Sequence, residues 1–313
     1  MRVPNPEEGT MWSRRIDSRT LLLAGAFTTA LAPSAVVAQV NTLPGVAEAL
    51  GRAGAAQPGG VTRFSFPRTD LTVVADGVTL KPALALGSWV AFKAMSPRMT
   101  EAMGDLVLLE DEVGPVMRAL QAGGVEQTAL HNHVLHESPR VMYMHVSAHG
   151  DAAKIAQTIH TALAATKTPL GAPAAPSAPS AADLDTAGIA AALGVAGKLN
   201  GDVYQVSVPR RERILEMGQE VPPSMGVATA INFQPTGGGK AAITGDFVMR
   251  ASEVNAVIRA LQASGITPTA LHSHMLDESP RLFFMHFWAN DDAVTLAKGL
   301  RAALDKTASK IGH

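Results

Sequence analysis

The chain has 313 residues, 47% of them hydrophobic and 17% charged, so it is long and apolar enough to bury two ordinary hydrophobic cores. Its 26 Lys and Arg residues balance 27 Asp and Glu residues, which argues against nucleic acid or an anionic membrane surface as a partner. The sequence contains no cysteine, and this excludes disulfides, thiolate metal sites, thiol nucleophiles and a lipid-modified cysteine. A bound metal would therefore need His, Asp, Glu or Met as ligands.

The first forty residues have the pattern of an export signal. Arg14, Arg15 and Arg19 precede an apolar run at Leu21–Leu31, and small residues follow where a signal peptidase could cut. We therefore predict a signal peptide at residues 1–38. The apolar run is shorter than the roughly twenty residues that a membrane-spanning helix needs. We expect a periplasmic or secreted protein with no stable membrane anchor after signal cleavage.

An internal repeat dominates the rest of the chain. A shift of 141 residues superposes Ala129–His145 on Ala270–His286, with identical residues at 11 of the 17 positions. Similar shifts match further pairs on both sides of this segment. We predict one domain present twice, joined by a linker rich in Pro and Ala, with boundaries at 43–166 for repeat 1, 167–185 for the linker and 186–307 for repeat 2.

Within a repeat, the hydrophobic pattern predicts helices and strands in a definite order. The first part contains a short helix and four β segments, at 44–53, 63–67, 72–80, 89–95 and 106–109. The second part contains a helix, two strands and a helix capped by Asp151, at 112–122, 125–135, 140–148 and 151–165. This order predicts an α+β sandwich, with the helices packed on one face of a largely antiparallel sheet.

Seven of the ten histidines lie in the two matched segments. Because alternate residues of a strand share a face, we expect His131 and His133 to point the same way. The neighbouring strand then brings His145 beside them. The corresponding set in the second repeat is His272, His274 and His286. We interpret each set as a transition-metal site, for which zinc or copper is the suitable ion. The apolar residues on the histidine side of the strands leave open a second arrangement, in which the two histidine faces meet across the pseudo-dyad.

The loop that follows each His-x-His pair adds further polar side chains. Glu137 and Glu278 could act as a fourth ligand, as a hydrogen-bond acceptor for an imidazole, or as a base for metal-bound water. Arg140 and Arg281 could hold a small anionic substrate, or pair with these glutamates in a loop salt bridge. The possible extra ligands are His136 and Asp277.

Structural interpretations compete with these functional ones. The histidines could be hydrogen-bonded groups that line a domain interface. Asp105 and Asp246, each preceded by glycine, are typical of turns. Met144 and Met285 fall on the opposite strand face from the histidines, so we expect them in the core. Three functions stay open: an exported metal-binding protein, a metal-dependent hydrolase, and a non-catalytic envelope interaction module.

The doubled pattern LHxHxLxESPRxxxMH, in a chain with an export signal, resembles the LppY/LpqO family of exported bacterial domains. The resemblance covers both repeats. It implies export and a tandem domain organisation. Because this family carries no established reaction, the resemblance implies no catalytic residues, and the functional hypothesis depends on the histidines alone.

Overall fold

The structure is a computed structural model that describes residues 43–171 and 183–311. These residues belong to one unit, Val40–His313. The predicted signal peptide and residues 172–182 of the predicted linker lie outside the described residues.

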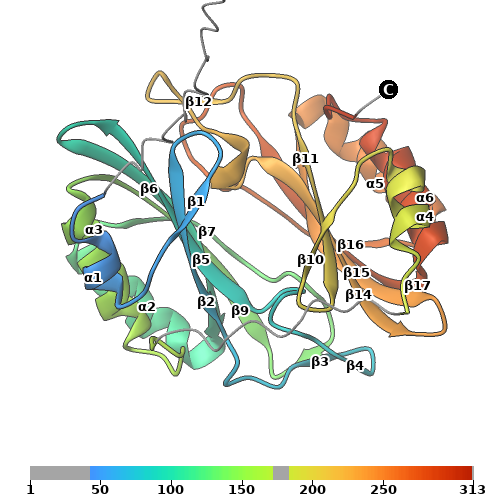
Figure 1. The fold of residues 1–313 in the computed structure, drawn as a ribbon, viewed down its shortest axis with the longest axis horizontal. Coiled ribbons are helices and arrows are strands. Elements are labelled where there is room, and N and C mark those ends of the chain that lie inside the picture. The colour runs from blue at the N-terminus through green and yellow to red at the C-terminus, as the bar shows by residue number, and fades with distance from the viewer. Residues whose placement is uncertain (1–42, 172–182, 312–313) are drawn as a thin grey trace, which may run out of the picture. The chain divides into compact units, whose positions relative to one another are not determined.

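Each repeat folds into a six-stranded antiparallel sheet with helices on one face, so the chain has the predicted α+β fold (Figure 1). The elements of the first repeat are α1 (Val46–Leu50), β1 (Ala55–Gln57), β2 (Val61–Pro67), β3 (Val74–Ala75), β4 (Val78–Thr79), β5 (Gly87–Ser96), β6 (Met99–Leu109), α2 (Glu110–Ala122), β7 (Glu126–His131), β8 (Glu137–Ser138), β9 (Val141–Gly150) and α3 (Ala152–Leu163).

The second repeat follows the same plan. Its elements are α4 (Thr186–Leu193), β10 (Lys198–Asn200), β11 (Val203–Pro209), β12 (Leu215–Glu216), β13 (Gln219–Glu220), the 3-10 helix η1 (Pro223–Met225), β14 (Ala228–Gly237), β15 (Lys240–Met249), α5 (Ala251–Ala263), β16 (Thr267–His272), β17 (Phe283–Asp292) and α6 (Ala293–Leu304). The two main sheets have matching strand orders, β1-β2-β5-β6-β9-β7 and β10-β11-β14-β15-β17-β16.

The helices begin and pack as their sequences predict. The Asp151 side chain accepts a hydrogen bond of 2.9 Å from the backbone N–H of Lys154 and so caps α3. In the second repeat, Asp292 caps α6 in the same way. Buried apolar residues at helical spacing then hold each helix on its sheet.

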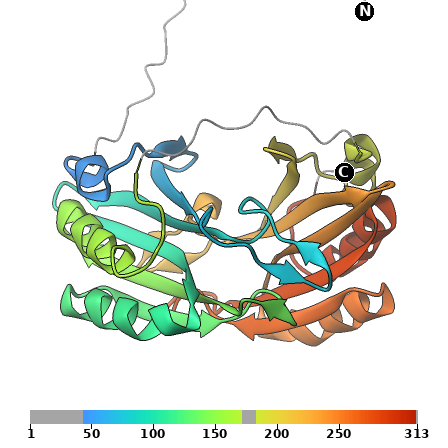
Figure 2. The same cartoon turned by 90° about the horizontal axis from the view of Figure 1, so that it is seen from below.

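The two sheets meet through the faces that the helices leave free (Figures 1 and 2). Two apolar clusters each join the helices of one repeat to its own sheet, and Met144 and Met285 lie in them as predicted. Two further clusters combine residues of both repeats, for example Tyr143 with Trp288, and Met103 with Phe284. The order of layers is therefore helix, sheet, sheet, helix, and the central interface belongs to both repeats.

A few element boundaries differ from the prediction. The segment 72–80, expected as one strand, forms the hairpin β3–β4, which turns at Asp76 and Gly77 with φ of 47° and 80°. Strand β6 begins at Met99, well before the predicted start at 106. Strand β7 ends at His131, four residues earlier than predicted, so His133 lies in the loop beyond it.

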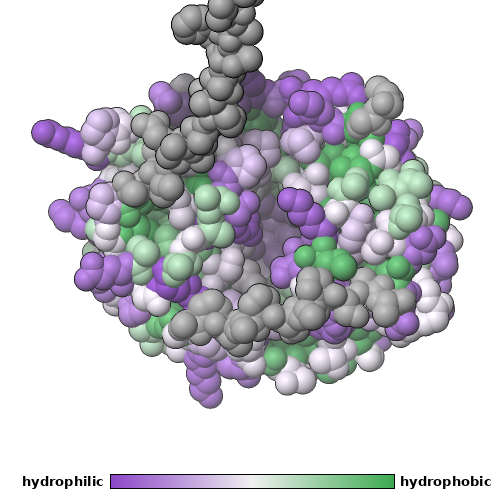
Figure 3. All heavy atoms as spheres, in the orientation of Figure 1, coloured by the Kyte–Doolittle hydropathy of each residue, from purple (hydrophilic) through white to green (hydrophobic). Residues whose placement is uncertain are grey.

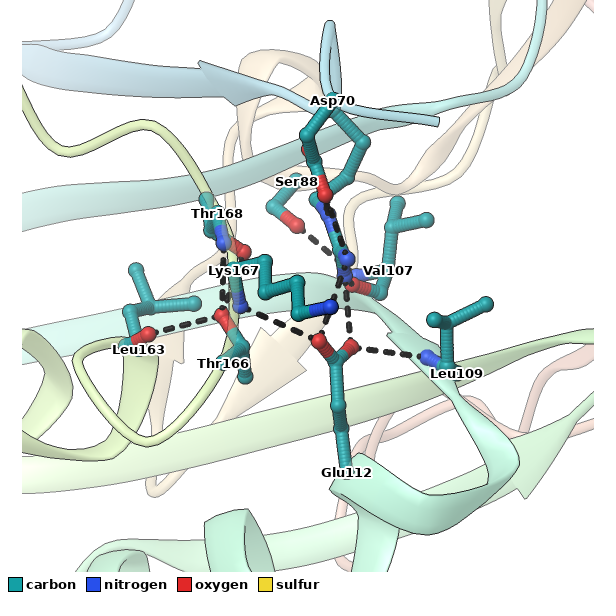
Figure 4. Close-up of polar contacts among 10 residues, drawn as sticks. Asp70, Ser88, Val107, Leu109, Glu112, Leu163, Thr166, Lys167 and Thr168 are labelled. Atoms are coloured by element: carbon teal, nitrogen blue, oxygen red, sulfur yellow. Dashed lines mark hydrogen bonds and ion pairs between the residues drawn. The ribbon is translucent and has the colours of Figure 1, made fainter. Parts of the chain in front are cut away.

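In each repeat, a buried arginine links the sheet to a helix through an ion pair. The Arg68 guanidinium is fully buried and donates to both carboxylate oxygens of Glu112, at 2.7 and 3.1 Å. Glu112 also accepts backbone N–H bonds from Leu109 and Lys167, as Figure 4 shows. Arg210 and Glu253 repeat this pair in the second domain.

Surface composition is mixed. On the face drawn in Figure 3, hydrophilic and hydrophobic residues are interspersed. Among the residues that the structure describes, no helix has the length and hydropathy needed to cross a membrane.

Candidate metal centre

The six histidines predicted as ligands gather in one cluster between the repeats. Three contacts join the repeats ring to ring: the centroids of His131 and His272 are 3.7 Å apart, those of His133 and His286 are 3.7 Å apart, and those of His145 and His274 are 3.8 Å apart. The sequence left open whether the two histidine faces meet, and the structure brings them together. Because the histidine faces of the two sheets are the faces that meet, the two sets merge.

Strand pairing places the third histidine of each set. His145 on β9 lies opposite Asp105 on β6, and His286 on β17 lies opposite Asp246 on β15. Directly opposed residues of an antiparallel pair share a face, so each histidine sits beside a carboxylate. This face is the one that meets the other repeat.

The His-x-His segments are held by the opposite repeat. The Thr128 hydroxyl donates to the backbone oxygen of His274 at 2.6 Å. Thr269 donates to the backbone oxygen of His133, also at 2.6 Å. The two bonds join equivalent residues of the two repeats, so each repeat holds the His-x-His segment of the other. His133 therefore stays in the cluster although it lies beyond the end of β7.

Aromatic rings support the second histidine of each pair. The His133 ring stacks on Tyr143 with a centroid distance of 3.3 Å, and the His274 ring stacks on Phe284 at 3.5 Å. These contacts fix the ring planes and exclude water from one side of the cluster.

Backbone carbonyls determine which nitrogen carries the proton in three of the rings. Nδ1 of His286 lies 2.6 Å from the Gly245 oxygen, and Nδ1 of His274 lies 2.9 Å from the Gly226 oxygen. Nδ1 of His272 contacts a backbone oxygen at 3.3 Å. A carbonyl only accepts, so Nδ1 bears the proton and Nε2 keeps a free lone pair. A backbone partner of this kind commonly orients a metal-binding histidine.

Several ring nitrogens find no hydrogen-bond partner among the described residues. They are Nδ1 of His131 and Nε2 of His133, His145, His272 and His274, of which Nε2 of His274 does contact the carboxylate of Asp246. Nε2 of His131 and Nε2 of His286 lie 3.1 Å apart. Two nitrogens bound to one tetrahedral ion at about 2.0–2.1 Å would be about 3.3 Å apart. The observed separation fits a hydrogen bond between the two rings and is also close to that of two ligands of a shared ion.

Two aspartates face the cluster, contrary to prediction. Asp105 and Asp246 lie inside strands β6 and β15, so their interpretation as turn residues is wrong. Oδ2 of Asp246 lies 2.8 Å from Nε2 of His274, and Oδ2 of Asp105 lies 3.5 Å from Nε2 of His133.

The glycine before each of these aspartates has a packing role. A Cβ on Gly104 would come within 2.7 Å of the Trp89 backbone oxygen, and one on Gly245 within 2.0 Å of the Ala230 oxygen. Glycine is thus required by close strand packing, not by a turn. The sequence does contain a signal for these aspartates. Each one directly precedes an apolar run, and the two occupy equivalent positions in the two repeats.

Burial controls the charge of the cluster. Desolvation lowers the pKa of all six histidines, to about 4 for His272 and His274. The same cause raises the pKa of Asp246. The rings are therefore neutral near pH 7, which is the form that binds metal ions.

Within the histidine cluster, three groups of side chains have the geometry to hold a metal ion, with ligand atoms within 4.8 Å of one another. They are His131, His133 and His286; His131, His145 and His272; and Asp246, His272 and His274. The first and third groups share no residue, and the second group shares His131 with the first and His272 with the third. Each predicted histidine appears in at least one group.

Sequence comparison places the chain in a family. Residues 44–165 and 187–306 each match the model described as Domain of Unknown Function (DUF1259). The chain belongs to the DUF1259 family. It carries two DUF1259 domains, which confirms the tandem duplication inferred from the sequence. The comparison with curated proteins gave no match.

Solved structures offer only a distant likeness. The trimeric bacterial microcompartment shell protein PduB is 12% identical, with 81% of this chain and 91% of that chain covered and a TM-score of 0.20. EtuB from Clostridium kluyveri is 10% identical, with coverage of 80% and 90% and a TM-score of 0.19. TM-scores this low carry no argument about the DUF1259 domains.

The predicted loop glutamates lie outside the metal-capable groups of the DUF1259 domains. An oxygen of Glu137 accepts the backbone N–H of Val141 at 3.2 Å, and burial raises the pKa of Glu137 to about 7. Glu278 is buried and accepts the backbone N–H of Leu282 at 2.7 Å. Both carboxylates therefore hold the loop that precedes the last strand of their domain.

The remaining predicted residues lie away from the cluster. Arg140 is exposed and 3.6 Å from Glu110, not paired with Glu137. Arg281 bonds to Glu278 at 3.2 Å, as the loop salt-bridge interpretation expected. The predicted extra ligands His136 and Asp277 are exposed and belong to no metal-capable group among the described residues.

Proposed function

We propose that this protein binds two transition-metal ions between its two DUF1259 domains. One ion is held by His131, His133 and His286. The other is held by Asp246, His272 and His274, with His145 packed against His274. The first ion would thus have ligands from both domains. The second ion would have ligands from the second domain, with His145 of the first domain beside them.

The observation that carries this proposal is the set of buried imidazole nitrogens that lack hydrogen-bond partners among the described residues, on rings that lie together in the cluster. A buried polar group without a partner costs about 1–3 kcal/mol. Histidines that served only as structure would be expected to satisfy these nitrogens with each other or with carbonyls. Coordination by an ion satisfies several of them together.

The ligand types favour zinc or copper. Imidazole nitrogen suits both ions, and a carboxylate completes a common coordination set for zinc. Met144 and Met285 pack in the cores of the two repeats and supply no thioether to the cluster. We therefore favour zinc or copper(II) over copper(I), which prefers sulfur ligands.

Burial supports metal binding in preference to catalysis. The His131, His145, His274 and His286 residues are at most 8% exposed. A metal-dependent hydrolase needs an open coordination position that substrate can reach, and a base beside it. Glu137 and Glu278, the candidate bases, are engaged with the backbone of their own loops.

We further propose that the protein acts outside the cytoplasm. The sequence pattern of residues 1–38 and the resemblance of the doubled histidine segment to the exported LppY/LpqO domains support a periplasmic or secreted metal-binding protein. Absence of cysteine is compatible with a compartment in which thiols are oxidised.

The test is elemental analysis of the purified full chain after loading with zinc or copper and removal of free metal. We expect about two ions per chain, and one fewer in His131→Ala/His133→Ala. His136→Ala removes an exposed imidazole outside the cluster and should leave the content unchanged. Equal metal content in the wild type and in a folded His131→Ala/His133→Ala protein would overturn the proposal, and would favour structural histidines.

A further inference from the structure

A second group of ionisable side chains lies outside the histidine cluster. Glu101 on β6 and His149 on β9 are directly opposed in the sheet, and Glu216 on β12 of the second repeat joins them. One ligand atom from each of the three lies within 4.8 Å of the others. Glu101 is four residues from Asp105 along β6, about 13 Å in a strand. The group is therefore separate from the proposed zinc or copper centre.

These side chains are buried with few partners. Glu101 is 1% exposed, and its carboxylate oxygens have no hydrogen-bond partner among the described residues other than the neighbouring Glu216 carboxyl, with which a proton could be shared. One oxygen of Glu216 and Nε2 of His149 are also buried and unpartnered. A buried carboxylate without hydrogen bonds is costly, so the group requires a compensating charge or a shared proton.

The surrounding charges are mainly negative. Glu101, Glu278 and Asp277 all raise the pKa of Glu216, which burial brings to about 7. Lys93, which lies opposite Glu101 on β5, is the cation that acts on Glu101. Its ammonium group donates to the backbone oxygen of Glu220. A divalent cation would neutralise both carboxylates.

The other half of the molecule shows that the fold does not need this group. Under the repeat, Glu101 corresponds to Ala242 and His149 to Asn290, which are again directly opposed. Glu216 corresponds to Ala75. Ala75 and Ala242 are fully buried in the same apolar cluster. Apolar packing thus fills the place that corresponds to this group in the other half of the molecule. The group itself has three side chains that could bind a metal.

We propose that Glu101, His149 and Glu216 form a second type of metal site, which binds a divalent cation through two carboxylate oxygens and one imidazole nitrogen. Oxygen ligands suit manganese, and imidazole suits zinc and iron, so this set selects ions of the manganese, iron(II) and zinc class. Movement of the side chains by about an ångström brings the ligand atoms to the roughly 3.0–3.5 Å spacing that metal bonds near 2.1 Å require.

Manganese is the most selective probe, because it binds imidazole-rich sets weakly. We would titrate the full chain, stripped of metal by a chelator, with Mn²⁺ and count bound ions by electron paramagnetic resonance. The expected result is one bound Mn²⁺, with affinity reduced at least about tenfold in Glu101→Gln and in Glu216→Gln. The His131→Ala/His133→Ala protein should still bind this ion.

Two controls keep the test decisive. Glu220→Gln removes a carboxylate from the same hairpin but outside the group, and should leave Mn²⁺ binding unchanged. Each glutamine variant is also checked for cooperative unfolding without metal, where loss of a buried charge should not reduce stability. Binding of Mn²⁺ with equal affinity by the wild type and Glu101→Gln, or no binding by either, would overturn the proposal and favour a carboxyl pair that shares a proton.

Discussion

The Thr128 hydroxyl of the first domain donates a hydrogen bond of 2.6 Å to the backbone oxygen of His274 in the second domain. This bond fixes the segment that follows β16 against the other repeat. Since Thr269 makes the same bond to His133, two short contacts control how the His-x-His segments approach each other.

We expect Thr128→Val and Thr269→Val each to reduce the free energy of unfolding by about 1 kcal/mol, because a buried carbonyl loses its donor. Metal affinity should fall as well, since the histidine after each strand is less well positioned. Chemical denaturation and metal titration measure the two effects. Thr158→Val is the control, because its hydroxyl makes an exposed hydrogen bond to the backbone oxygen of Lys154 within α3. A loss no larger than that of Thr158→Val would contradict this interpretation.

The buried pair of Arg68 and Glu112 should be more important for stability than any surface ion pair (Figure 4). Arg68→Met leaves Glu112 and Asp70 without their buried partner, and we expect a loss of about 3 kcal/mol in unfolding free energy. Arg140→Met breaks an exposed pair with Glu110 and should cost less than about 0.5 kcal/mol. Equal losses of unfolding free energy for the two variants, measured by urea denaturation, would show that the buried pair contributes no more to stability than the exposed one.

Glu137 should make the fold less stable at alkaline pH. Its pKa is raised from 4.5 to about 7 in the folded protein. The protonated carboxyl therefore stabilises the fold below pH 4.5, and this contribution is lost as the pH rises through 7. Glu137→Gln should match the wild type at low pH and exceed it by about 1 kcal/mol above pH 8, after allowance for partial exposure. Identical pH profiles of unfolding free energy would contradict the raised pKa.

Much of the fold could be predicted because its signals are local. The 141-residue repeat, the helical spacing in α2 and the Asp151 cap each depend on short stretches of sequence. The exposure of Leu130 and Leu271, at 43% and 52%, could not be predicted from strand alternation. Alternation assigns them to the face opposite the histidines, but β7 and β16 are edge strands and the helices do not cover them there.

The histidines of the candidate site could be predicted from the sequence, whereas the meeting of the two sets could only be raised as a possibility. Pattern and spacing identified all six histidines, because the repeat shows each one twice. The exchange of ligands between domains depends on sheet packing across the interface, which no local pattern encodes. For the same reason Asp105 and Asp246 were assigned to turns, and the group of Glu101, His149 and Glu216 was not foreseen.

The most direct test of the account is whether one ion is shared between the two domains. The measurement is the metal content of His133→Ala, His286→Ala, His133→Ala/His286→Ala and His133→Ala/His274→Ala after loading with zinc or copper. Because His133 and His286 are ligands of the same ion, their double variant should lose one ion, as each single variant does. Only His133→Ala/His274→Ala should lose two. Loss of two ions from His133→Ala/His286→Ala would instead mean that each domain binds its own ion, and would contradict the exchanged site.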